Sequence, residues 1–122
     1  GAQVLVEPPY YQGVTVVAAL RGRGRSGWSL LRERALRALY DYLNPIDGGP
    51  DGTGWPFGRP IQSGEIYAVL QRVEGIDLVE DVRLFAADPV TGERGSAVQR
   101  IDLPPHALVF SYAHQVRVTG GG

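Results

Sequence analysis

The sequence predicts an α+β fold, in which a small, mostly antiparallel sheet of three to four strands carries two helices on one face. Two observations lead to this prediction. Apolar residues alternate with a period of two near the start of the chain and again in its second half, whereas two segments between them repeat with the period of a helix. The elements therefore follow the order β-α-α-β-β-β. Because two helices reverse the chain twice, we expect the first two strands to run antiparallel.

The composition indicates one domain with a modest core. The chain has 122 residues, 43% of them apolar, with a net charge of -1 and no cysteine, so disulfides and thiolate chemistry are excluded. We expect residues 1–12 to be an extended connector from a preceding domain, because Pro8 and Pro9 follow a short apolar run. Residues 13–119 are the predicted domain, and residues 120–122, all glycine, are a predicted flexible tail. We expect the chain to be part of a longer protein.

The first strand and the first helix are recognised by a change of period. From Gly13 onward, alternate residues are expected to face the core, namely Val14, Val16, Ala18 and Leu20. Residues 28–43 then place an apolar stripe along one side of a helix, made of Trp28, Leu31, Ala35, Ala38, Leu39, Tyr42 and Leu43. Ser26 or Ser29 can cap the start of this helix. Pro45 ends it, because proline disfavours the helical conformation at the preceding residue.

The second helix is expected to begin at Ser63 as its N-cap, with Glu65 in the first turn. Gly75 is expected to end it in a left-handed conformation. Residues 82–86 alternate as a strand, and residues 88–94 form a turn that leads into a predicted hairpin with residues 98–103. Residues 115–119 are the last predicted strand, with Val116 and Val118 facing inward.

A glycine-rich turn lies between the first strand and the first helix. From Gly22 to Gly27 it matches the G-x-G-x-x-G pattern, which binds a pyrophosphate at a helix N-terminus in dinucleotide-binding folds. Such folds also require a parallel strand after the helix, whereas here a glycine-rich loop follows. Two interpretations therefore remain, a nucleotide-binding enzyme fragment and a flexible turn.

Arginine is concentrated near the first helix. Six of the twelve basic residues lie within seventeen positions, and these are Arg21, Arg23, Arg25, Arg32, Arg34 and Arg37. Guanidinium groups bind anions in a planar fork. The cluster can be a nucleic-acid-binding module, a charged protein interface or a solvated surface. The candidate interface residues are Arg21, Arg23, Arg25, Arg34 and Arg37.

The remaining ionisable residues predict no catalytic residue, no metal site and no cofactor, and we expect the chain not to be an enzyme. His106 and His114 are the only histidines, and neither has a carboxylate or a second histidine at ligand spacing. Both are interpreted as structural. Asp47 and Asp51 lie in a glycine-rich stretch that lacks the alternating oxygen ligands and closing glutamate of a calcium loop.

A long loop of glycine and proline, residues 48–60, contains two large aromatic side chains, Trp55 and Phe57. Ordering such a loop costs conformational entropy. Burial of the two rings would offset that cost and anchor the loop. Arg59 would then be held in place, either paired with a helix end or a nearby acid, or projecting toward a neighbouring subunit.

The loop and the segments around it resemble the C-terminal region of the baseplate J-like family. The resemblance extends from about Tyr10 to Val118 and rests on residues 43–50, 63–67 and 73–79 around a Gly-Trp-Pro-Phe-Gly-Arg core. The core residues are Gly54, Trp55, Pro56, Phe57, Gly58 and Arg59. Gly64 departs from the second serine or other polar residue expected in this cap.

The resemblance implies a structural role. Members of this family are baseplate assembly proteins of contractile phage tails and of the related extracellular contractile injection systems, and their wedge subunits associate around the tail hub. It implies other baseplate subunits as partners, in homo-oligomeric and hetero-oligomeric rings, with no small-molecule substrate and no membrane insertion. Assembly is expected in the bacterial cytoplasm, in a particle that is released in some systems. The resemblance brings no catalytic residues.

Overall fold

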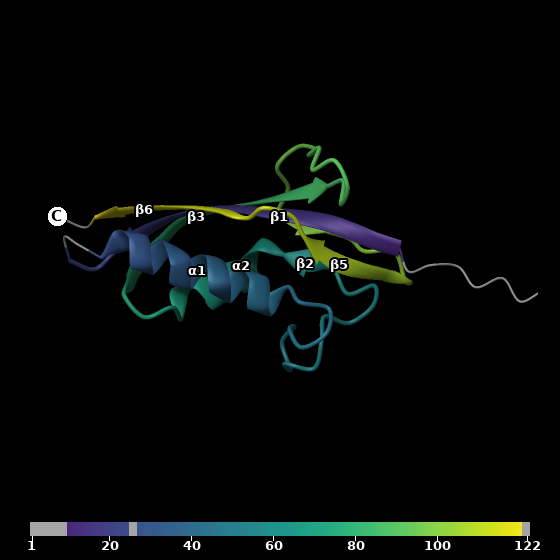
Figure 1. Ribbon diagram of the computed structural model, residues 1–122, viewed down its shortest axis with the longest axis horizontal. Helices are drawn as coiled ribbons and strands as arrows, with labels where there is room; N and C mark the ends of the chain where they lie inside the picture. Colours follow the sequence, from purple (N-terminus) through teal and green to yellow (C-terminus); the bar gives the residue numbers. More distant parts are fainter. Residues whose placement is uncertain (1–9, 25–26, 121–122) are drawn as a thin grey trace, which may run out of the picture.

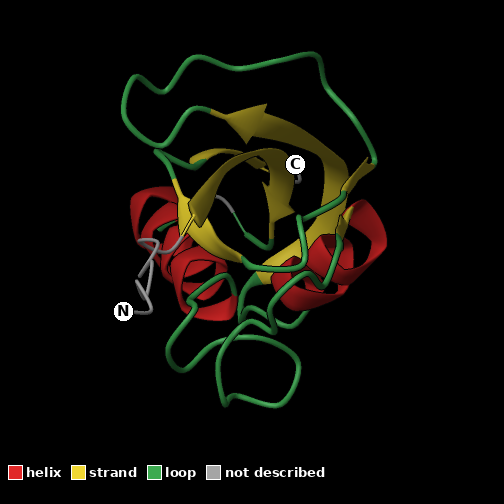
Figure 2. Cartoon of the chain, turned by 90° about the vertical axis from the view of Figure 1, so that its right-hand side faces the viewer, coloured by secondary structure: helices red, strands yellow, loops and turns green. Residues whose placement is uncertain are grey.

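The computed structural model describes residues 10–24 and 27–120, and within them it confirms the predicted α+β class. Two helices lie beneath one face of a curved sheet (Figures 1 and 2). The elements in chain order are β1 (Tyr10–Gly22), α1 (Trp28–Tyr42), β2 (Ile61–Gln62), α2 (Ser63–Gln71), β3 (Ile76–Ala87), β4 (Arg100–Ile101), β5 (Ala107–Ser111) and β6 (Gln115–Gly120).

Strand β1 is the centre of the main sheet. It pairs antiparallel with β3 on one side, as predicted for the first two long strands. On its other side it pairs in parallel with β5 and then, further along the same edge, with β6. The main sheet is therefore mixed rather than mostly antiparallel as predicted. Strand β3 ends near the start of β1, where Ala87 pairs with Gly13. The chain then crosses to the other side of β1, and β5 begins beside Tyr10. Strand β5 therefore runs in the same direction as β1, and so does β6 after it.

The predicted hairpin of residues 98–103 with the second long strand is wrong. Only two isolated bridges join this region to β3, Leu84 with Val98 and Ala87 with Arg94. The short strand β4 pairs instead with β2 in a separate two-stranded sheet. In this pair Ile101 lies opposite Ile61, and its side chain is buried. The predicted turn of residues 88–94 is present, and the Asp88 carboxylate accepts hydrogen bonds from the amides that follow it.

The core lies between the sheet and the two helices. Val14, Val16, Ala18 and Leu20 of β1 are buried, as the alternation predicts. They face a stripe on α1 and two residues of α2. Those residues are Leu31, Ala35 and Leu39 from α1, and Ile66 and Leu70 from α2. Trp28, which was expected on the buried stripe, is 37% exposed because it lies at the first turn of α1, beyond the main core.

The predicted helix caps need correction. Gly27, in the left-handed region, is the N-cap of α1, and no side chain caps this end. Ser29 therefore lies inside the helix, and Ser26 lies outside the described residues. Helix α2 begins at Ser63, but its N-cap is Gln62, which forms a capping box with Glu65. Gly75 has a φ of 96°, in the left-handed region as predicted, but it does not end α2, because the helix ends at Gln71 with Arg72 as its C-cap.

The ends of the domain also differ from the sequence prediction. Strand β1 begins at Tyr10, so residues 10–12 belong to the sheet rather than to a connector. Strand β6 includes Gly120, which was assigned to the tail. The rest of the predicted connector, residues 1–9, and of the tail, residues 121–122, lies outside the described residues. No helix in the described ranges is long and apolar enough to cross a membrane.

Candidate functional site

The loop of residues 44–60 folds back onto the end of α1. The carbonyl oxygen of Asn44 accepts hydrogen bonds from the amides of Gly48 and Trp55, both at 3.0 Å. The carbonyl oxygen of Tyr42 accepts one from the amide of Gly49 at 2.7 Å. A Cβ atom at Gly48 would collide with the carbonyl oxygens of Asp41 and Tyr42. Glycine is thus required here because the loop backbone approaches the helix closely.

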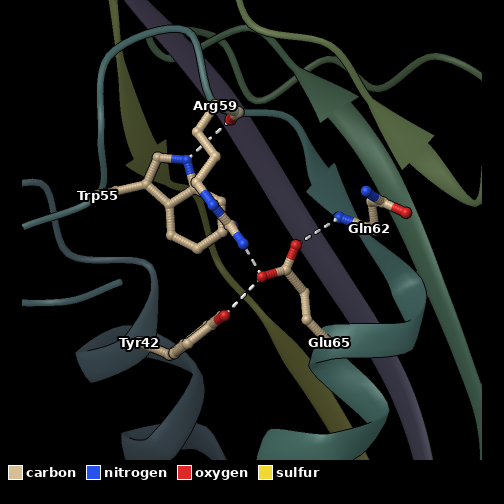
Figure 3. A network of polar contacts seen from close by, with 5 residues as sticks. All are labelled: Tyr42, Trp55, Arg59, Gln62 and Glu65. Atoms are coloured by element: carbon tan, nitrogen blue, oxygen red, sulfur yellow. Dashed lines mark hydrogen bonds and ion pairs between the residues drawn. The ribbon is translucent and has the colours of Figure 1, made fainter. Parts of the chain in front are cut away.

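Trp55 anchors the loop. Its side chain is 2% exposed, and its indole nitrogen donates a hydrogen bond to the carbonyl oxygen of Arg59 at 2.9 Å. The ring meets Tyr42 of α1 edge to face, with 5.4 Å between centroids. The Arg59 guanidinium lies over the indole, 4.8 Å from the ring centroid (Figure 3). Such aromatic and cation–π contacts add to the stabilisation from burying the ring.

Glu65 connects the loop to both helices. One carboxylate oxygen, Oε1, accepts hydrogen bonds from the Tyr42 hydroxyl at 2.5 Å and from Nη1 of Arg59 at 2.8 Å. The other oxygen accepts the backbone amide of Gln62 at 3.1 Å (Figure 3). A single side chain therefore ties the end of α1, the loop and the start of α2 together. We call Tyr42, Trp55, Arg59, Gln62 and Glu65 the clamp.

Tyr42 and Arg59 keep their protonation states at neutral pH. Burial raises the pKa of Tyr42 to about 12, and the hydrogen bond and charge of Glu65 contribute to the shift. Tyr42 therefore remains a neutral donor. The hydrogen bond to Glu65 raises the pKa of Arg59 as well, so the guanidinium stays charged. Because the carboxylate accepts from three protein donors, the arrangement is suited to holding backbone segments in place rather than to proton transfer.

The side chains of the Gly-Trp-Pro-Phe-Gly-Arg segment, residues 54–59, lie on two sides of the loop. Trp55 and Arg59 point inward, and Arg59 pairs with a nearby acid, one of the two roles considered for it. Phe57 is 64% exposed, so the expectation that both aromatic rings anchor the loop is wrong for Phe57. Gly54 and Gly58 have positive φ values of 114° and 70°. Two such residues turn the backbone so that one ring is buried and the other is presented to solvent.

The candidate interface arginines in the described part of the chain differ in their pairing with acids, and Arg37 of α1 lies 3.9 Å from Asp41. Arg21 pairs with Glu80 at 3.2 Å, and Arg23 pairs with Asp77 at 4.0 Å, so both are partly neutralised by acids of β3. Arg34 and Arg37 lie on the exposed side of α1. Arg25 lies outside the described residues. The sequence alone did not reveal the pairing with β3, because it depends on the strand register.

The glycine-rich turn does not lead into a parallel strand. Its first glycine, Gly22, ends β1, and the next long strand of the main sheet, β3, runs antiparallel to β1. The amide of Arg23 donates a hydrogen bond to the carbonyl oxygen of Gly75 at 2.9 Å. Gly24 and Gly27 both have a φ of 80°. The turn therefore packs against the end of the α2–β3 connection, an arrangement that differs from a dinucleotide-binding unit.

His114 occupies the junction between β5 and β6. Its Nδ1 accepts a hydrogen bond from the amide of Val16 at 2.9 Å, and its Nε2 lies 2.8 Å from the Ser111 hydroxyl. Strand β1 pairs with β5 as far as Val14 and with β6 from Val17 onward. Between these two ladders, the imidazole accepts the hydrogen bond of the Val16 amide that a strand would otherwise accept. Burial lowers the pKa of His114 to about 4. The structural interpretation is confirmed for this histidine, whereas His106 lies exposed on the surface.

No group of three or more metal-ligating side chains comes together within residues 10–24 and 27–120. A groove of about 440 Å³ lies on the sheet in the described part of the chain, and Val17, Asp81, Arg83 and Arg117 help to line it. Comparison with known proteins finds neither a family model that matches the sequence nor a curated protein similar to it.

Proposed function

We propose that this chain is a structural domain of a baseplate wedge subunit in a contractile phage tail or contractile injection system, and that it acts through protein–protein assembly. The observation that carries the proposal is the clamp, because it fixes a glycine-rich loop that nevertheless presents Phe57 to solvent. A partner that covers an aromatic side chain on an already rigid loop has little ordering entropy to overcome. The resemblance of the loop to the baseplate J-like family suggests that the partner is another baseplate subunit.

The proposed partners are other baseplate subunits, arranged in a ring around the tail hub. Assembly in the bacterial cytoplasm, before any release of the particle, follows from the same resemblance. Phe57 and Ile46, which is 82% exposed, are the large apolar side chains that the loop offers to such partners. Exposed apolar side chains on a rigid surface are typical of sites where proteins associate.

Particle assembly in the organism that encodes the chain tests this proposal. Deletion of the chain should eliminate intact contractile particles from electron micrographs of the pelleted lysate. Phe57→Asp should reduce intact particles at least about tenfold, because it places a charge in a desolvated contact, while the folded domain loses less than about 0.5 kcal/mol. Thr53→Asp, an exposed position of the same loop, is the matched control and should assemble normally. Normal particles without the chain would refute the proposed function.

The exposed arginines of α1 give a second prediction. Combined Arg34→Glu and Arg37→Glu should slow assembly and make it less sensitive to salt, because charges at the rim of an interface mainly steer association. The thermal midpoint of the purified domain should remain close to that of the unmodified chain, because both side chains are exposed. Assembly rates measured across a salt series provide the readout. Unchanged rates at every salt concentration would show that this surface is only solvated.

A further inference from the structure

Strand β6 leaves one edge of the main sheet open. Among the described residues it pairs only with β1, and no backbone hydrogen bond joins its other edge to a further strand. In a parallel pair, alternate residues direct both backbone groups to the same side, so about half of the six residues of β6 offer an N–H and a C=O to a new neighbour. An unpaired edge of this kind is a template for another strand.

A groove runs along this open edge. It has a volume of about 370 Å³ and lies between β6 and the first turns of α1, which run beside each other in Figure 1. Its lining residues are Trp28, Ser29, Arg32, Val116, Arg117 and Val118. We call it the β6 groove. Trp28 and Val118 supply apolar surface, and Trp28 is partly exposed there.

The β6 groove is basic. Arg32 and Arg117 are both exposed, and neither forms an ion pair with an acid in the described part of the chain. No acidic residue lines the groove. The combination of an unpaired strand edge, an apolar floor and two available guanidinium groups fits an extended segment in which apolar and acidic residues alternate.

A second copy of this chain fits the groove poorly. The opposite edge of the sheet is β3, whose acids already pair with arginines of the same chain, Glu80 with Arg21 and Asp81 with Arg83. The amide of Val82 on that strand is also satisfied, since it donates to the Tyr67 hydroxyl of α2. These two carboxylates and the amide of Val82 are therefore already occupied within the same chain.

We propose that an extended acidic segment of a different partner protein adds to β6 as a further strand, with its carboxylates toward Arg117 and its apolar side chains toward Trp28. The inference rests on the assembly role proposed above, for which it supplies one contact. A strand beside the whole of β6 (Gln115–Gly120) would span about 20 Å. This contact is separate from the clamped loop and has its own experiment.

Peptide binding to the purified chain tests the inference. The probe is a fluorescein-labelled heptapeptide of alternating valine and glutamate, followed by anisotropy at low salt. We expect saturable binding, with new protection of the β6 amides against hydrogen exchange. Arg117→Glu should weaken binding at least about tenfold, because it reverses a charge in the groove. Arg72→Glu, the same charge change at an exposed position after α2, should alter it less than about twofold.

Two further peptides separate strand addition from simple charge attraction. A peptide with N-methyl groups at alternate residues keeps its carboxylates but cannot complete the ladder, so it should bind at least about tenfold more weakly. A valine–lysine peptide should not bind. Equal binding of the N-methylated peptide, or no binding of the acidic one, would overturn the inference. So would self-association in sedimentation velocity that Arg117→Glu abolishes, since the occupant would then be a second copy. None of these results depends on whether deletion of the chain prevents particle assembly.

Discussion

Trp55→Ala is expected to lower the free energy of unfolding by about 3 to 5 kcal/mol, the range for truncating a large buried aromatic side chain. The indole is almost fully buried, packs against Tyr42 and lies beneath the Arg59 guanidinium. Truncation would leave a cavity beside the end of α1 and remove the hydrogen bond from the indole nitrogen to the carbonyl oxygen of Arg59. The loss should appear in urea unfolding followed by far-ultraviolet circular dichroism.

Phe57→Ala provides the matched control, since it removes a second aromatic ring from the same loop. Phe57 is largely exposed, so its truncation should change the free energy of unfolding by less than about 0.5 kcal/mol. Trp55→Phe should fall between the two, because it retains an aromatic ring and loses the hydrogen bond. If Trp55→Ala proves as mild as Phe57→Ala, the loop is not anchored by burial of the indole.

Acidification is expected to destabilise the domain by about 3 kcal/mol through His114 alone. Burial lowers the pKa of this histidine from 6.5 to about 4, and each pKa unit corresponds to about 1.4 kcal/mol. Because the unfolded state binds the proton more readily, the stabilisation is fully present above pH 6.5 and is lost as the pH falls toward 4. Protonation would also place an N–H on Nδ1 against the amide of Val16, which now donates to it.

Urea unfolding at several pH values between 4 and 7 measures this effect. Carboxylates also titrate near the lower end, so the informative quantity is the difference in slope between the unmodified chain and a variant. His114→Gln should be less stable at pH 7 but show a flatter dependence between pH 6.5 and 4. An NMR titration that places the pKa of His114 near 6.5 in the folded domain would contradict this account.

Local patterns in the sequence were sufficient to predict the long elements of the fold. The alternation from Val14 to Leu20 marks a strand with one buried face, and the apolar stripe of Leu31, Ala35 and Leu39 marks the first helix. These patterns are reliable because each element buries one side against the same core. Turn chemistry predicted the conformation of residues 88–94 for a similar reason, since the Asp88 side chain bonds to its own following amides.

Features that depend on contacts between distant segments were missed. Strand β5 is short and follows two prolines, and its parallel pairing with the start of β1 has no local signature. Strand β4 pairs with β2 rather than in the predicted hairpin, and the burial of Ile101 in this pair also depends on distant segments. The paired state of Arg21 and Arg23 follows from the register between β1 and β3.

The candidate site was predictable in part. The abundance of glycine around a tryptophan indicated an anchored loop, and Trp55 is buried as expected. The opposite fate of Phe57 was not visible, because backbone torsions at Gly54 and Gly58 decide which ring turns inward. The role of Glu65 was foreseen only as a helix-start carboxylate. Its bonds to Tyr42 and Arg59 arise because three separate segments meet at this point.

Hydrogen exchange at the loop amides tests most directly whether the clamp holds the glycine-rich loop in a single conformation. The amides of Gly49, Gly54 and Trp55 all donate to backbone carbonyl oxygens. We predict that they exchange at least about 100-fold more slowly than in an unfolded chain, and that Trp55→Ala removes this protection even where the remaining domain stays folded. Exchange at unfolded-chain rates in the unmodified protein would contradict a rigid loop and, with it, the proposed role of the loop in assembly.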